Sequence, residues 1–151
     1  MGLKLLRRGK VRDIYEVDKN HLLLVASDRV SAFDYVLTPE IPDKGRVLTR
    51  ISRFWFERFD DVPNHCVSYD VGDVEGARKE WEGRVMLVRR AEVIPYEFIV
   101  RGYLAGSSWE QYCRDGTAYG YRLPEGLSKG AKLPEPILTP TTKALEGHDE
   151  P

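Results

Sequence analysis

The sequence predicts an α+β fold in which an antiparallel, β-rich part comes first. Three observations lead to this expectation. The first third of the chain consists of short apolar runs separated by turn residues, one segment after it has helical apolar spacing, and a second short helix follows further strand-like runs. We therefore expect a β-rich lobe over residues 1–93 and the beginning of a second α+β lobe over residues 94–151.

Three strand-like runs open the chain and predict an antiparallel meander, over residues 3–7, 11–17 and 21–26, and a short segment over residues 30–37 follows them. The turn residues between them are Gly9-Lys10 and Asp18-Lys19-Asn20, and a Pro- and Gly-containing stretch at residues 39–45 ends the series.

A helix is expected over residues 47–59, because apolar residues recur there at helical spacing. The apolar stripe of this helix consists of Val47, Leu48, Ile51, Phe54, Trp55 and Phe59. Arg50, Arg53 and Glu57 face away from the stripe, and Thr49 and Ser52 have no special role. A cofactor could use such an aromatic stripe, but we expect it to pack in the core.

The remaining elements are strand-like runs over residues 65–69, 84–93 and 96–100, a helical turn near residues 74–80, and a helix over residues 107–115 that Gly116 ends. From Gly120 onward the composition changes, since five prolines fall within residues 124–151. Such a stretch predicts either a long ordered loop that carries function or a linker.

The composition is that of a globular chain and narrows its function. The 151 residues are 42% hydrophobic and 31% charged, and 23 basic against 24 acidic residues give a formal net charge of −1. This balance argues against a nucleic-acid coat and against a polybasic membrane anchor, because both need an excess of positive charge. No apolar run approaches the roughly 20 residues of a membrane span, and the first ten residues lack the apolar core of a signal peptide.

Cys66 and Cys113 are the two cysteines, and their separation fits neither a zinc site nor a disulfide framework. We expect both to be reduced packing residues in a cytoplasmic protein without nucleic-acid or membrane partners.

A basic glycine turn, Gly9-Lys10-Val11-Arg12, lies between the first two strand-like runs. Glycine lets a backbone approach a ligand closely, and Lys10 and Arg12 would project from one face of the following strand. Two cations beside such a turn suit a polyphosphate, although a solvated basic hairpin has the same residues.

Polar residues follow the third run, at residues 27–34. Asp28 and Asp34 could accept hydrogen bonds from a ligand. Alternatively, an aspartate pairs with Arg29 in a capped turn.

Glu97, Ile99 and Arg101 share one face of an expected strand, and a charged pair on a central strand is costly unless it is paired or used. Ser107 opens a helix, whose first N–H groups attract anions. Arg101 and Ser107 could therefore hold a phosphate or carboxylate. The alternative is a structural Glu97–Arg101 pair with Ser107 as N-cap.

Lys143, His148 and Asp149 lie close together near the end of the sequence. Lysine can neutralise a transferring phosphoryl group, and Asp and His can bind a metal or an amine, but a tail without a role could carry the same residues.

Taken in order, these segments closely resemble the SAICAR synthetase (phosphoribosylaminoimidazole-succinocarboxamide synthase) family. The matching segments are residues 9–15, 27–34, 41–45, 95–107, 139–144 and 147–149. The resemblance implies a SAICAR synthase-like fold that begins with a kinase-like ATP lobe. It also implies an ATP-dependent carbon–nitrogen ligase of purine biosynthesis, which joins L-aspartate to carboxyaminoimidazole ribotide through an acyl phosphate, giving SAICAR, ADP and phosphate. ATP, Mg²⁺ and the two other substrates are the implied ligands, and a homo-oligomer stays open.

The resemblance also implies roles for individual residues. Phosphates of ATP would lie under Gly9, Lys10, Val11 and Arg12, with Val93 in the hinge near the adenine. The substrate site would include Ser31, Asp34, Lys44, Arg101, Ser107 and His148. Catalytic roles fall to Lys143, Arg101 and Asp149, and no residue of this chain is assigned to the metal.

One departure from the family concerns length. Family members continue into an Asp-x-Lys-x-Glu-Phe-Gly-like segment and an acidic Pro-Asp-Ser-rich segment, which supply metal-binding carboxylates, and neither segment occurs here. We expect a partial chain that does not turn over alone. The alternative is a nucleotide-binding module without catalytic activity.

Overall fold

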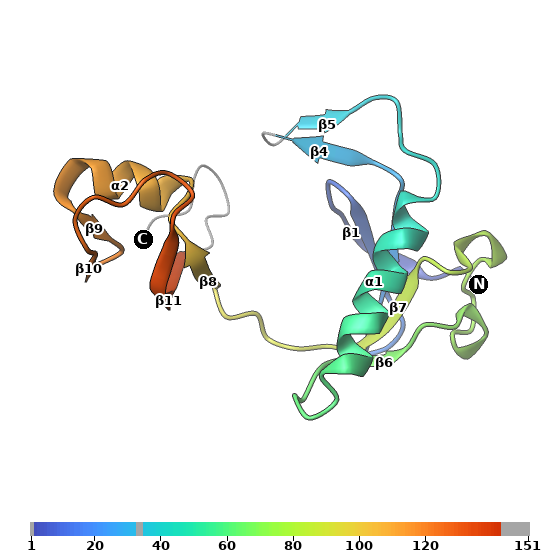
Figure 1. The fold of residues 1–151 in the computed structure, drawn as a ribbon. Coiled ribbons are helices and arrows are strands. Elements are labelled where there is room, and N and C mark those ends of the chain that lie inside the picture. Colours follow the sequence, from blue (N-terminus) through green and yellow to red (C-terminus); the bar gives the residue numbers. More distant parts are fainter. Residues whose placement is uncertain (1, 33–34, 143–151) are drawn as a thin grey trace. The chain divides into compact units, whose positions relative to one another are not determined.

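The computed structural model describes residues 2–32 and 35–142, which fall into two compact units, Met1–Glu92 and Val93–Pro151 (Figure 1). Each unit combines antiparallel strands with one α-helix, so the expected α+β class is confirmed. None of the helices in the described ranges is long and apolar enough to cross a membrane.

The first unit is built on a five-stranded antiparallel sheet whose order confirms the N-terminal meander. Across the sheet its strands are β1 (Lys4–Arg8), β2 (Arg12–Glu16), β3 (His21–Ala26), β7 (Val85–Arg89) and β6 (Cys66–Ser68). The β2–β3 turn closes through the Asp18 carboxylate, which accepts hydrogen bonds from the backbone N–H groups of Asn20 (2.6 Å) and His21 (2.9 Å). Such a local side-chain bond is what makes Asp a turn former.

One face of this sheet carries the main core of the first unit. Its buried side chains are Tyr15, Leu23, Val25, Val74, Val85 and Leu87. Residues 71–81, which contain the 3₁₀ turns η1 (Val71–Asp73) and η2 (Lys79–Trp81), cover this face, and the Trp81 ring lies 4.7 Å from that of Tyr15. Because side chains alternate along a strand, Leu24, Ala26 and Met86 lie on the opposite face.

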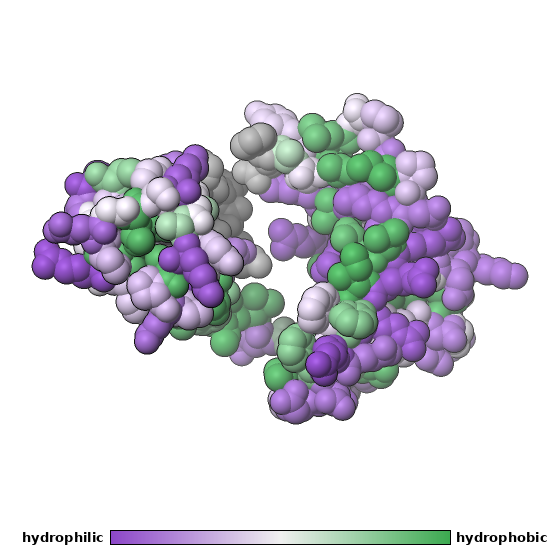
Figure 2. Space-filling view, viewed as in Figure 1, coloured by the Kyte–Doolittle hydropathy of each residue, from purple (hydrophilic) through white to green (hydrophobic). Residues whose placement is uncertain are grey.

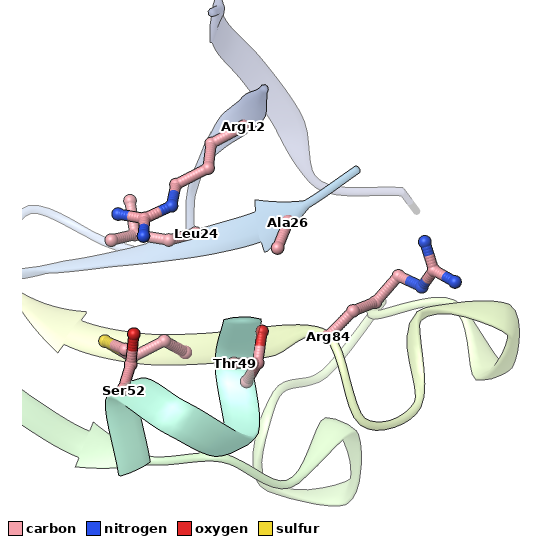
Figure 3. Close-up of a pocket in the computed structure, with 7 residues that line it drawn as sticks. Arg12, Leu24, Ala26, Thr49, Ser52 and Arg84 are labelled. Atoms are coloured by element: carbon pink, nitrogen blue, oxygen red, sulfur yellow. The ribbon is translucent and has the colours of Figure 1, made fainter. Parts of the chain in front are cut away.

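Helix α1 (Lys44–Arg58) lies on this opposite face, but it does not bury the apolar stripe (Figure 3). Thr49 and Ser52 point toward the strands instead. Gly45 approaches β3 so closely that a Cβ atom there would lie 2.5 Å from the carbonyl oxygen of Ala26. The expectations that the stripe packs in the core and that Thr49 and Ser52 are passengers are therefore wrong. A helix seated this close to a sheet needs small residues at the contact, which leaves its large residues on the other side.

The segment at residues 30–37 contains two short antiparallel strands, where the sequence analysis expected a single short segment. They are β4 (Val30–Ala32) and β5 (Tyr35–Leu37), with Val30 opposite Leu37.

The second unit contains a two-stranded ribbon, β8 (Tyr96–Tyr103) with β11 (Lys132–Thr142), and helix α2 (Ser107–Asp115). The predicted bounds of α2 are confirmed, and Gly116 ends the helix with a φ of 74°, a left-handed conformation that favours glycine. Two short strands follow, β9 (Thr117–Ala118) and β10 (Tyr121–Arg122). The core residues of this unit are Leu104, Ala118, Leu133 and Ile137.

The proline-rich stretch is neither a loop nor a linker over residues 132–142, because β11 forms there. Pro140 stands opposite Phe98 in the ladder, and Pro134 and Pro136 fall where the register is irregular. Proline is tolerated at the edge of a sheet and at bulges, where its missing N–H removes no ladder bond.

The two thiols differ in exposure. Cys66 is half-buried on β6, whereas Cys113 is exposed on α2, so the packing role expected for Cys113 is wrong.

Candidate functional site

Side chains of the segment that follows β3 donate hydrogen bonds to the backbone of the glycine turn between β1 and β2. The Arg29 guanidinium donates hydrogen bonds to the carbonyl oxygens of Gly9 (3.0 Å) and Lys10 (3.1 Å). The Ser27 hydroxyl donates to the carbonyl oxygen of Val11 (2.9 Å). Three consecutive carbonyl groups of the turn thus have side-chain partners from two neighbouring positions. The turn and the residue 27–29 segment, which the sequence analysis treated separately, form one structural unit that we call the turn clamp.

A part-buried ion pair completes the turn clamp. Arg29 also contacts the Asp13 carboxylate at 2.6 Å, and both side chains are less than one-fifth exposed. Arg8 approaches the same carboxylate at 3.6 Å from the solvent side. The charge of Arg29 is therefore used in holding the turn. Lys10 and Arg12, the cations of the turn itself, are exposed residues.

Gly9 is required by a close approach. Its N–H donates to the carbonyl oxygen of Arg12 at 2.7 Å, and a Cβ atom at position 9 would lie 2.8 Å from that oxygen. Any side chain would force this tight bond apart.

Asp28 faces α1 and pairs with Arg84, so the alternative of a local pair with Arg29 is wrong for Asp28. Its carboxylate accepts hydrogen bonds from the Gly45 N–H (2.9 Å) and from the Arg84 guanidinium (3.0 Å). The N-cap residue Asp43 makes no side-chain cap, and its own N–H donates to Asp28 (3.3 Å). Asp28 thus caps α1 from a distant part of the chain.

The pKa of the Asp28 carboxyl reflects two opposing causes. Burial alone would raise it, but the hydrogen bond from Gly45 and the adjacent Arg84 guanidinium outweigh burial and hold the pKa below its ordinary value. Asp28 is therefore ionised at neutral pH, and its carboxylate fixes the first turn of α1 against the sheet.

Arg12 projects onto the same face of the sheet as α1 (Figure 3). It lines a small pocket together with Leu24 and Ala26 of β3 and Thr49 and Ser52 of α1. The pocket has a volume of about 10 Å³, which is room for at most one water molecule. A nucleotide phosphate reaching Arg12 would therefore approach along the open surface of the turn and not through this pocket.

In the second unit, Arg101 and Ser107 are brought together by Tyr119. Arg101 donates to the Thr139 hydroxyl (3.1 Å) and to the Tyr119 hydroxyl (3.5 Å), and its guanidinium carbon lies 5.2 Å from the centre of the Tyr119 ring. The Ser107 and Tyr119 hydroxyls are 2.7 Å apart. Thr139 is fully buried and donates in turn to the Ile99 carbonyl oxygen (3.0 Å). We call Arg101, Ser107, Tyr119 and Thr139 the hydroxyl–arginine cluster.

This arrangement suits an anion. Among residues 2–32 and 35–142, the groups that orient Arg101 are neutral hydroxyls and an aromatic ring, which fix the guanidinium without neutralising its charge. The first residue of α2 is Ser107, where helix N–H groups favour negative charge.

Ser107 is not the N-cap, because Gly106 occupies that position and makes no side-chain cap. The Ser107 hydroxyl points to Tyr119 instead. Tyr119 itself has a φ of 49°, an unfavourable conformation for a residue with a side chain. Such backbone strain often occurs at functional sites. Sequence reasoning missed Tyr119 and Thr139, and only the family segment at residues 139–144 could have drawn attention to Thr139.

Three of the other predicted site residues lie within the described ranges, and each has its own surroundings. Ser31 is half-buried on β4, Lys44 is the half-buried first residue of α1, and Val93 is 73% exposed between β7 and β8. The remaining candidates lie outside the described residues: Asp34, Lys143, His148 and Asp149.

Residues 2–32 and 35–142 contain no group of three or more His, Cys, Asp or Glu side chains that could hold a metal ion.

Comparison with known proteins places the chain in a family. The sequence profile of SAICAR synthetase matches residues 5–151. Phosphoribosylaminoimidazole-succinocarboxamide synthase of Thermodesulfovibrio yellowstonii is 55% identical over 153 residues, covering 98% of this chain and 52% of the relative. The enzyme of the same name from Syntrophotalea carbinolica is 56% identical over 155 residues, covering 99% and 52%.

A solved structure agrees with the sequence comparison. SAICAR-synthase from Saccharomyces cerevisiae, complexed with SAICAR, superposes with a TM-score of 0.85 at 44% identity, covering 98% of this chain and 52% of that one. The chain thus spans about half the length of these relatives. Since the family profile matches nearly the whole sequence and the fold agrees, the chain belongs to the SAICAR synthetase family.

Proposed function

We propose that this chain carries the nucleotide-facing and ribotide-binding half of an ATP-dependent ligase, which joins L-aspartate to carboxyaminoimidazole ribotide to give SAICAR, ADP and phosphate. Family membership supports the reaction. The observation that carries the proposal in this chain is the hydroxyl–arginine cluster, a cation held by neutral groups beside the first residue of a helix.

The reaction explains why cations are needed. A carboxylate is a poor electrophile, so one of its oxygens first attacks the γ-phosphorus of ATP, and ADP leaves. The aspartate amine then attacks the acyl carbon, phosphate leaves and the amine loses a proton. Each ligand in this sequence is an anion, and fixed positive groups lower the free energy of holding such anions together.

The glycine turn is suited to the triphosphate. Lys10 and Arg12 would donate to phosphate oxygens, while the turn clamp keeps Gly9 and Val11 in one conformation. A loop fixed before binding loses less conformational entropy when the ligand arrives.

The hydroxyl–arginine cluster is suited to the ribotide phosphate. Arg101 can donate two parallel N–H bonds to phosphate oxygens, and Ser107 supplies a hydroxyl next to helix N–H groups. Tyr119 sets the positions of both side chains.

The other roles in this proposal rest on family motifs alone. Lys143 and Asp149 would act in catalysis, His148, Asp34, Ser31 and Lys44 would contact substrates, and Val93 would lie near the adenine. Mg²⁺ would accompany ATP, but no step is assigned to it through the described residues. Purine synthesis of this kind fits a cytoplasmic location.

Calorimetry with SAICAR tests the proposal. We expect the chain to bind SAICAR, and Arg101→Met to weaken binding about 10- to 100-fold, as the loss of charge-assisted hydrogen bonds predicts. Arg122→Met, which removes an exposed arginine on β10, is the matched control and should leave the affinity unchanged.

A second titration, with Mg-ATP, distinguishes the proposed function from the alternative of a nucleotide-binding module. A chain that binds Mg-ATP and ignores SAICAR would be a nucleotide-binding module, and the ribotide site proposed for Arg101 would be wrong.

A further inference from the structure

The outer side of α1 carries an apolar surface that the rest of the first unit leaves uncovered. The side chains of Val47, Leu48, Ile51, Phe54, Trp55 and Phe59, which we call the α1 stripe, are 37–57% exposed. Hydrophobic side chains gather along α1 with hydrophilic ones to either side (Figure 2). A continuous exposed apolar surface of this kind marks an interaction site more often than a solvated face.

A groove deepens one end of this surface. It is formed by Ile51, Trp55 and Phe59 of the α1 stripe together with residues 62–65, and it encloses about 590 Å³ with mostly apolar walls. The Trp55 and Phe59 rings are stacked, with centroids 5.6 Å apart, so the two rings form one aromatic part of the groove wall. Aromatic side chains that are already ordered lose little entropy on binding, which makes them strong anchors.

The packing of α1 shows that the exposure is not an accident of a frayed helix. Gly45 and Thr49 are buried against the sheet, and Asp28 caps the first turn. A surface helix normally buries its large apolar side chains and exposes its polar ones. Helix α1 exposes most of its large apolar side chains along with its charged ones and buries only Gly45 and Thr49, which is the pattern of a helix in the middle of three layers.

The charges on α1 argue against a second copy of the chain as the third layer. The helix has five basic residues and one acidic residue, and that one, Glu57, is paired with Arg53 at 2.7 Å. Two copies meeting through α1 would bring these positive charges together, which is unfavourable at an interface. The basic residues around the apolar side chains of α1 favour a partner surface that is apolar at its centre and acidic at its rim.

We infer that the α1 stripe is an internal seam, against which the portion of the SAICAR synthetase polypeptide that this chain does not span packs. The relatives are about twice as long as the matched region, so the family contains a second half large enough to form such a layer. A seam within one fold is apolar and extensive, as the α1 stripe is, and the two halves should therefore associate even as separate polypeptides.

Sedimentation velocity tests this inference without any substrate. The partner is the part of the Thermodesulfovibrio yellowstonii relative that has no counterpart in this chain, expressed as a separate polypeptide. We expect a one-to-one complex. In a chain with Trp81→Phe and Trp109→Phe, the tryptophan fluorescence that complex formation changes should shift to the blue as the Trp55 indole leaves water. Phe54→Glu and Val47→Glu, at two places on the α1 stripe, should each weaken association at least 10-fold. Both positions are exposed, so circular dichroism should show unchanged folding.

Leu6→Glu is the matched control. Leu6 is an apolar residue of similar exposure, 39%, and lies on β1, at the opposite edge of the sheet from β6. Absence of a complex, or equal weakening by Leu6→Glu and Phe54→Glu, would overturn the inference. So would a homodimer of the chain that Phe54→Glu dissociates and that the partner polypeptide cannot. A complex that forms but makes no SAICAR would leave the seam intact and contradict only the proposed function.

Discussion

Single side chains that bind backbone carbonyl groups determine the shape of the glycine turn between β1 and β2. Arg29 reaches two carbonyl oxygens of the turn and the Asp13 carboxylate at once, which its planar guanidinium allows and a lysine ammonium does not. For Arg29→Lys we expect a loss of about 1–3 kcal/mol in the free energy of unfolding. We also expect roughly 10-fold weaker Mg-ATP binding, because the turn is no longer fixed before the ligand arrives.

The same substitution at Arg8 is the control for this prediction. Arg8 contacts the same carboxylate at 3.6 Å but its side chain is 68% exposed, and an exposed ion pair contributes little. Urea unfolding and calorimetry should therefore find Arg8→Lys close to the unmodified chain. If both variants bind Mg-ATP equally well, the turn clamp has no part in nucleotide binding.

Asp28 makes the stability of the first unit dependent on pH. Its pKa in the folded chain lies below the ordinary value of 3.8, so its stabilising effect is complete above that value and is lost as the pH falls through the folded pKa. For Asp28→Asn we expect a loss on the order of 1–3 kcal/mol at pH 7. The difference between the two proteins should stay constant down to about pH 5 and shrink below pH 4.

Urea unfolding at pH 7, 5 and 3.5 measures this dependence. Glu75→Gln, which neutralises an exposed carboxylate of the same unit, should show no comparable difference. The free energies of unfolding of Asp28→Asn and the unmodified chain could also differ by the same amount at all three pH values. That result would mean that the charge of Asp28 does not help to hold α1 on the sheet.

At this scale the sequence identified charged candidates but not the groups that orient them. Arg101 and Ser107 stand in a recognisable segment, and their juxtaposition was expected. Tyr119 lies between two very short strands, in no motif, and its contacts with both side chains arise only when the chain folds back. Likewise Asp28 could pair with the adjacent Arg29 in sequence, but in the structure Arg84, 56 positions away, is its partner.

At the scale of elements, the contact between α1 and β3 is set by a missing side chain. A Cβ atom at position 45 would lie 2.5 Å from the Ala26 carbonyl oxygen and 3.1 Å from that of Ser27. Alanine is the better helix former by about 1 kcal/mol, but the clash outweighs this gain. We expect Gly45→Ala to destabilise the first unit by about 1–3 kcal/mol, the usual effect of overpacking.

Thermal unfolding followed by circular dichroism checks this prediction, with Gly102→Ala as the control. Position 102 has open space, since a Cβ atom there would meet no heavy atom within 4 Å. A Gly45→Ala protein as stable as the Gly102→Ala protein would show that α1 is not seated on β3 as closely as described.

Elements with local signals were predictable, and those that depend on distant partners were not. The Asp18 turn fixes the start of β3 and Gly116 fixes the end of α2, so both could be read from neighbouring residues. By contrast, β11 is a strand because β8 lies beside it, although its proline content suggests a loop. The helical spacing of apolar residues correctly predicted α1. That spacing does not show whether the apolar side packs on the sheet of the same chain or on a layer outside the chain.

At the scale of the whole molecule, the chain spans about half the length of its synthase relatives, and under the proposed function its chemistry should depend on the other half. We expect no SAICAR and no substrate-dependent phosphate release from the chain alone. With the complementary portion of the Thermodesulfovibrio yellowstonii relative added, SAICAR and phosphate should appear in equal amounts, at a rate that saturates as the added polypeptide is increased. The reason is that saturation reports assembly, whereas the limiting rate reports the chemistry of the assembled site.

Two variants separate these quantities. Phe54→Glu lies on the α1 stripe and should require at least 10-fold more of the complementary polypeptide while reaching the same limiting rate. Arg101→Met should lower the rate at subsaturating substrate, however much polypeptide is added, because it removes the cation of the hydroxyl–arginine cluster. Product formation at full rate by the chain alone would contradict the division of the site between two halves, since every group that the reaction needs would then lie within these 151 residues.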